Sequence, residues 1–119
     1  MTKTAASAPQ YVYKILSKEL WQQAVEAGRF EGAPVDLEDG FIHFSTDRQM
    51  RETAAKHFNG QTELNLLQVD TAALDMVWEV SRGGQLFPHL YDILPLSAVV
   101  QVWDLPLGAD GVHHFPAVV

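Results

Sequence analysis

The segment at residues 41–46, FIHFST, sets a histidine beside hydroxyl and aromatic groups. Side chains alternate between the two faces of a strand, so Phe41, His43 and Ser45 project to one side. An imidazole next to a hydroxyl and an aromatic ring is a common lining of a small polar cleft. The segment therefore predicts one wall of a ligand site. A histidine on a half-apolar strand also fits a structural role, so that alternative stays open.

A second segment, FPHLY, begins at Phe87 and repeats this combination. The same alternation places Phe87, His89 and Tyr91 on a shared face. We expect His43, Ser45, His89 and Tyr91 to line a single cavity. The alternative is that both histidine segments simply pack inside a protein-interaction domain.

The composition suits one domain and excludes several kinds of site. The chain has 119 residues, of which 47% are hydrophobic, and no cysteine. The absence of cysteine excludes disulfide bonds, a thiolate nucleophile and a cysteine zinc site, and it fits a reducing cytosol. No apolar run reaches membrane-spanning length, and Met1–Gln10 is too short for a signal-peptide core. We expect a cytoplasmic protein with no membrane partner, whose residues 1–10 form a flexible tail.

The net charge of −7 limits the choice of partner. An acidic surface repels polyanions and disfavours general nucleic-acid binding, which needs a basic surface. A small anionic ligand remains compatible if one or two cations converge locally. The candidate cations are Lys14, Arg29, Arg48, Arg51 and Arg82.

Local patterns in the first half predict the elements that hold these residues. Aromatic and β-branched residues at 11–16 indicate a strand, and Ser17 and Gly28 are the expected start and stop signals of a helix. Residues 31–40 are rich in Gly, Pro and acid and predict a surface loop. Its acidic residues, Asp36, Glu38 and Asp39, are expected to form a solvated turn, with a metal site as the alternative.

The second half predicts one more helix and then mainly strands. Thr46 to Gln49 matches a capping box, and Met50, Ala54 and Phe58 recur every four residues, which indicates a helix from Thr46 to Phe58. Further strands are expected at residues 64–69, 76–80, across the second histidine segment and at 98–105.

This order predicts a single α+β domain at residues 11–107, followed by a C-terminal tail at 108–119. Two helices would pack on a curved, mostly antiparallel sheet.

The combination of these segments resembles the bacterial domain of unknown function family 952. Its members carry a Tyr-His-Ile strand, a helix with Trp, Ala and a closing Gly, a Gly-Phe-Ile-His-x-Ser segment and a Phe-Pro-His-x-Tyr segment. The corresponding residues here are Tyr13-Lys14-Ile15, then Trp21, Ala24 and Gly28, then Gly40 to Ser45, and Phe87 to Tyr91.

That family looks like a distant relative of the ADP-ribosyltransferases, in particular of RNA 2′-phosphotransferases. The resemblance implies an ADP-ribosyltransferase-like fold and a small-molecule nucleotide ligand, with NAD as a candidate substrate. It makes Lys14, His43 and Ser45 the counterparts of residues that help hold NAD. Lys14 departs from the usual histidine, since a flexible point cation lacks the directional hydrogen bond of an imidazole.

The resemblance further implies transferase chemistry at the ribose anomeric carbon, which passes through an oxocarbenium-like state. The catalytic candidates are His43, His89 and Glu79, with His89 or Glu79 as base. The ligand-binding candidates are Lys14 for phosphate, Ser45 for ribose, Phe87 or Tyr91 for stacking, and Thr46. Thr46 begins the helix whose N-terminus we expect to face an anionic group. A non-catalytic nucleotide- or metabolite-binding module needs the same residues and remains an alternative.

Overall fold

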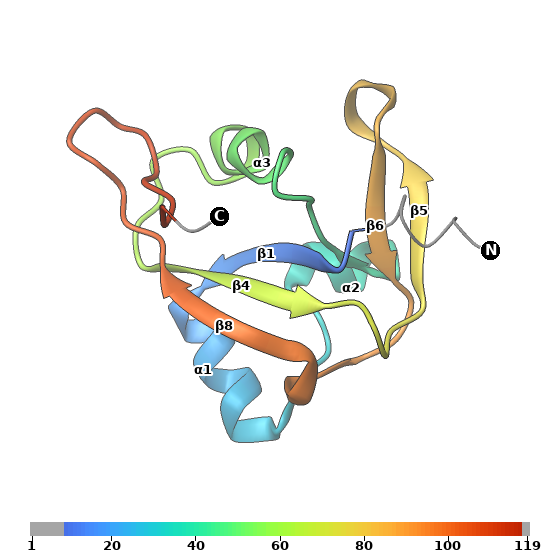
Figure 1. The fold of residues 1–119 in the computed structure, drawn as a ribbon. Helices are drawn as coiled ribbons and strands as arrows, with labels where there is room; N and C mark the ends of the chain where they lie inside the picture. The colour runs from blue at the N-terminus through green and yellow to red at the C-terminus, as the bar shows by residue number, and fades with distance from the viewer. Residues whose placement is uncertain (1–8, 118–119) are drawn as a thin grey trace.

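The computed structural model describes residues 9–117 apart from the side chain of Arg82, so residues 1–8 of the expected N-terminal tail lie outside the described part. Within this range the chain forms a single α+β domain in which all the paired strands are antiparallel (Figure 1). The strands are β1 (Tyr11–Ser17), β2 (Arg29–Phe30), β3 (Ile42–His43), β4 (Leu64–Asp70), β5 (Met76–Val80), β6 (Leu86–Leu90), β7 (Leu94–Pro95) and β8 (Val99–Asp104). The helices are α1 (Lys18–Ala27), α2 (Pro34–Asp39) and α3 (Met50–His57), with short 3₁₀ helices at Arg82–Gly84 and Leu96–Ala98.

The central sheet has the strand order β1-β4-β8 and is covered on both faces (Figure 1). Val12 and Leu16 of β1 pack into one core, on the side of α1. Tyr13 and Ile15 point the other way and pack against Met50 of α3. This alternation buries both faces of β1, because each face of a strand presents every second residue.

A second sheet, with the order β3-β6-β5, stands apart from the first (Figure 1). The chain just after β3 meets β1 at one residue pair. The backbone N–H of Tyr13 donates to the backbone oxygen of Ser45 at 2.7 Å, and the backbone N–H of Ser45 donates to the backbone oxygen of Tyr13 at 2.8 Å. The expectation of one curved sheet was therefore wrong. After Ser45 the chain turns towards α3, so the pairing with β1 stops. The two-residue strands β2 and β7 form a further small sheet.

Helix α2 lies where we expected a loop, so the prediction of two helices was wrong. Pro34 occupies the first turn, and Gly40 ends the helix with a φ of 86°. The side chain of Asp36 accepts a hydrogen bond from the backbone N–H of Ala33 at 2.7 Å, which fixes the first turn. Asp36 is 1% exposed and so is not part of a solvated turn.

The predicted limits of α1 are confirmed, and those of α3 are confirmed in part. Ser17 accepts a hydrogen bond from the N–H of Leu20, and Gly28 ends α1 in the left-handed conformation. Thr46 and Gln49 form the reciprocal bonds of a capping box: each donates its backbone N–H to the other's side chain. The regular helix begins only at Met50, after this turn.

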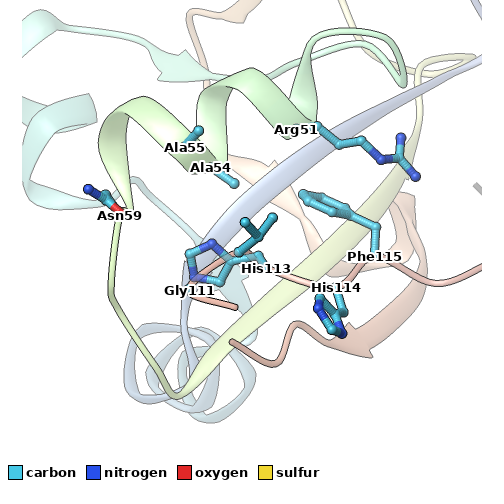
Figure 2. A pocket seen from close by; sticks show the side chains of 9 residues that line it. Arg51, Ala54, Ala55, Asn59, Gly111, His113, His114 and Phe115 are labelled. Atoms are coloured by element: carbon cyan, nitrogen blue, oxygen red, sulfur yellow. The ribbon is translucent and has the colours of Figure 1, made fainter. Parts of the chain in front are cut away.

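The segment after residue 107 returns to α3 instead of extending as a tail (Figure 2). The ring of His113 is 6% exposed, and its Nε2 donates to the backbone oxygen of Gln61 at 2.8 Å. The guanidinium of Arg51 lies 4.9 Å from the ring centre of Phe115. Removing these rings from water favours packing of the segment against α3, although its sequence is rich in Gly and does not predict a strand.

Candidate functional site

A cavity of about 740 Å³ lies beside the edge of β1 that carries the Tyr13–Ser45 bridge. Residues from β1, α1, α2, the segment around β3, α3 and β6 form its wall. The wall includes Lys14, His43, Ser45, Phe87 and His89 from the residues that the sequence singled out. Thr46, Glu79 and Tyr91 are not among the described residues that line it.

The two histidines lie on the same side of the second sheet. β3 pairs with β6 so that His43 is directly opposite His89, and the ring centres are 5.5 Å apart with an edge-on arrangement. The ring of Phe41 stacks on His89 at 4.1 Å and lies 4.6 Å from His43. Strand register and an aromatic neighbour thus hold both imidazoles at the cavity wall.

Each ring nitrogen of His43 faces a carboxylate of α2. Nδ1 lies 2.6 Å from Asp36, and Nε2 lies 2.9 Å from Asp39. The backbone N–H of His43 also donates to Asp36, at 3.1 Å. Asp36 is buried, whereas Asp39 is exposed and lines the cavity.

Lys14 and Asp36 form a buried ion pair behind His43. The ammonium lies 3.0 and 2.9 Å from the two carboxylate oxygens, and the residues are 6% and 1% exposed. Burial lowers the pKa of Lys14, and the charge of Asp36 offsets part of this effect. Burial opposes ionisation of Asp36, but hydrogen bonds from His43 and the charge of Lys14 outweigh it and lower the pKa of Asp36 to about 2.

His89 is held by a carboxylate on the neighbouring strand. Its Nδ1 lies 2.7 Å from Glu79, and the hydroxyl of Tyr91 donates to the same oxygen at 2.6 Å. The hydrogen bonds from Tyr91 and then His89 lower the pKa of Glu79, and the bond to Glu79 raises the pKa of Tyr91. His89 is 5% exposed, and among the described side chains, which exclude that of Arg82, its Nε2 has no hydrogen-bond partner.

The remaining predicted residues have local partners. The hydroxyl of Ser45 lies 2.9 Å from that of Thr53, on α3, and the hydroxyl of Thr46 accepts from the N–H of Gln49. Tyr91 is 54% exposed and lies 5.1 Å from the ring of Phe41. Thr46 and Tyr91 therefore border the site without forming its wall. Within the described chain, no group of three or more His, Asp or Glu residues is arranged to hold a metal ion.

Asp36 and Asp39 are the site residues that the sequence reasoning missed. Both belong to the acidic cluster that we assigned to a solvated loop. The available signal was Pro34 before them and Gly40 after them, since these residues commonly start and end a helix. A helix between Pro34 and Gly40 brings both carboxylates to His43.

Known proteins provide an independent comparison for this chain. No curated protein matches its sequence. A crystal structure of protein CC0527 from Caulobacter crescentus matches with a TM-score of 0.83 and 53% identity, covering 87% of this chain and 93% of that chain. The solution NMR structure of CC0527 matches with a TM-score of 0.79 and 54% identity, covering 87% and 91%. None of the helices in the described range is long and apolar enough to span a membrane.

The family model described as "Protein of unknown function (DUF952)" matches residues 15–102. This range contains both histidine segments and the last three residues of β1. It covers well over half of the chain. The chain therefore belongs to the DUF952 family.

Proposed function

We propose that the cavity binds a nucleotide of the NAD or ADP-ribose type and that the protein acts at the anomeric carbon of its ribose. The supporting observation is His89, which is buried on the cavity wall with Nδ1 held by Glu79 and with no partner for Nε2 among the described side chains. A buried polar atom without a hydrogen bond costs about 1–3 kcal/mol. A ligand hydroxyl or an attacking water would remove this cost.

The arrangement around His89 suits a general base. Glu79 accepts the Nδ1 proton, so the lone pair is on Nε2, as proton abstraction requires. The hydroxyl of Ser45 and the ring of Phe87 lie on the same wall. They are the candidates for a ribose hydrogen bond and for stacking with a planar base.

For Lys14 we propose a role other than the phosphate contact that the sequence predicted. Its ammonium already lies within 3.0 Å of both oxygens of Asp36. A cation neutralised in this way contributes little attraction for an external anion. We therefore propose that Lys14 orients Asp36, and that ligand affinity depends only weakly on salt concentration.

A thermal-shift panel of NAD, ADP-ribose, adenosine and ribose 5-phosphate tests this function. We expect at least one of them to raise the Tm of the wild type. His89→Gln should weaken that ligand's Kd at least tenfold because it removes the imidazole lone pair. His114→Gln is the matched control, since His114 is exposed and outside this cavity.

Product analysis on the ligand that binds then separates the candidate activities. Cleavage of the bond at the anomeric carbon supports the enzyme. Binding without cleavage identifies a non-catalytic nucleotide-binding module instead. No shift with any of the four compounds overturns the nucleotide proposal.

A further inference from the structure

We propose that His43 and His89 have opposite proton-transfer roles: His43 is a doubly protonated proton donor, and His89 is the proton acceptor. This division rests on the proposed function for its chemistry, but the protonation states that it requires are properties of the ligand-free protein. Asp36 and Asp39 are the positioning residues that hold His43 in the donor form.

The contacts of His43 are best satisfied by a proton on each ring nitrogen. An ionised carboxylate only accepts hydrogen bonds, whereas a neutral imidazole has one N–H and one lone pair. A neutral ring would therefore direct a lone pair at Asp36, 2.6 Å away, or at Asp39, 2.9 Å away. Only the imidazolium donates to both.

The charges around His43 favour the same form. Helix α2 contributes the negative charges of Asp36 and Asp39, and β1 contributes the positive charge of Lys14. These three groups sum to one negative charge, which a protonated His43 neutralises. Of the rings that pack against it, Phe41 is uncharged and His89 is the only other titratable one within residues 9–117.

His89 has the complementary environment. Its Nδ1 donates to Glu79, and no described side chain forms a hydrogen bond with its Nε2. A positively charged His43 at a ring distance of 5.5 Å would repel a second positive ring, which favours neutral His89. Two similar groups are thus separated into acid and base by their neighbours.

The two roles give a balanced step at the anomeric carbon. For a leaving group bonded through oxygen, the bond between the anomeric carbon and that oxygen breaks, and the oxygen keeps the electron pair. It takes the Nε2 proton of His43, whose hydrogen bond to Asp39 is given up in the step. The nicotinamide of NAD leaves as a neutral molecule and needs no such proton. A water oxygen forms the new bond, and its proton goes to Nε2 of His89. His43 ends neutral and His89 positive, so one proton has moved across the site and solvent exchange restores the starting state.

Ring ¹⁵N NMR of the ligand-free full chain at pH 7 tests this inference. We expect both nitrogens of His43 to show the shift of a protonated nitrogen. His89 should show a protonated Nδ1 and an unprotonated Nε2. A neutral His43 with a single N–H, or a protonated Nε2 on His89, would overturn the assignment.

Asp39→Asn tests the positioning role. The carboxylate at Nε2 is lost, so we expect His43 to become neutral with its proton on Nδ1, next to Asp36. Asp110→Asn is the matched control, because Asp110 contacts the exposed His114 at the same four-residue spacing. It should change only the His114 signals, and unchanged His43 signals in Asp39→Asn would contradict the proposal. The spectra need no ligand, so a negative thermal-shift panel would disprove the proposed function without deciding the protonation states.

Discussion

Asp36 accepts hydrogen bonds from the ammonium of Lys14, from the ring and backbone of His43 and from the backbone of Ala33. Both its oxygens are used, which is how proteins normally satisfy a buried carboxylate. The Asp36 side chain thus fixes the first turn of α2, the orientation of the His43 ring and the position of the Lys14 ammonium. Loss of its charge should affect all three.

Acid titration measures this contribution. The pKa of Asp36 falls from 3.8 to about 2 on folding, so its ionised form stabilises the folded state above pH 3.8. As the pH falls from 3.8 towards 2, this stabilisation, about 2 kcal/mol, should be lost. Urea unfolding at several pH values measures the loss.

The control for this titration is the double variant Lys14→Met with Asp36→Asn, which keeps the net charge of the pair at zero. It should lack this Asp36 contribution between pH 4 and 2. The single variant Asp36→Asn leaves Lys14 buried without a counter-charge and should lose about 3–5 kcal/mol. An acid response in the double variant as large as that of the wild type would contradict the assignment to Asp36.

At the element scale, α2 is the part of the fold on which the geometry of His43 depends. It is a six-residue helix that carries both carboxylates that contact the ring. Its end is set by Gly40, whose φ of 86° an L-residue adopts only at a cost. The same geometry ends α1 at Gly28, with a φ of 82°.

This similarity gives a matched pair of variants. A Cβ added at Gly40 or at Gly28 meets nothing within 4 Å, so Gly40→Ala and Gly28→Ala differ only in the helix that they strain. Each should lose about 1 kcal/mol in urea unfolding. Only Gly40→Ala should shift the ring resonances of His43. Equal shifts in both variants would show that α2 has no special role.

At the scale of the whole molecule, the C-terminal segment packs against α3, where Phe115 contacts the core cluster that contains Ala54. It forms a second cavity of about 600 Å³ with that helix, lined by residues that include Ala54 and His113 (Figure 2). The bridge between Leu107 and His113 and the bond from His113 to Gln61 hold the segment in place. We therefore propose that residues 108–117 belong to the domain.

Removing the His113 ring should loosen this segment. His113→Ala loses a buried hydrogen bond and should cost about 1–3 kcal/mol. The amides of Gly108 and His114, which donate to the backbone oxygens of Val112 and Pro106, should exchange faster with solvent. His114→Ala is the control, because His114 is exposed and should change the stability by less than about 0.5 kcal/mol. Equal exchange rates in both variants would mean that His113 does not anchor the segment.

The sequence by itself determined the local features of the fold, namely the faces of strands and the ends of helices. Strand alternation predicted the shared face of His43 and Ser45, and capping patterns predicted the ends of α1 and the turn before α3, because each depends on contacts within a few positions. The family resemblance followed from the order of four short segments along the chain, which include both histidine segments.

Only the tertiary structure decided which distant groups meet. The 5.5 Å approach of His43 and His89 depends on the pairing of β3 with β6, and the burial of Asp36 depends on Lys14 from β1. An acidic cluster between Pro34 and Gly40 has the same local pattern whether it is solvated or buried. Its burial becomes favourable only when a cation and an imidazole from other elements compensate the loss of water.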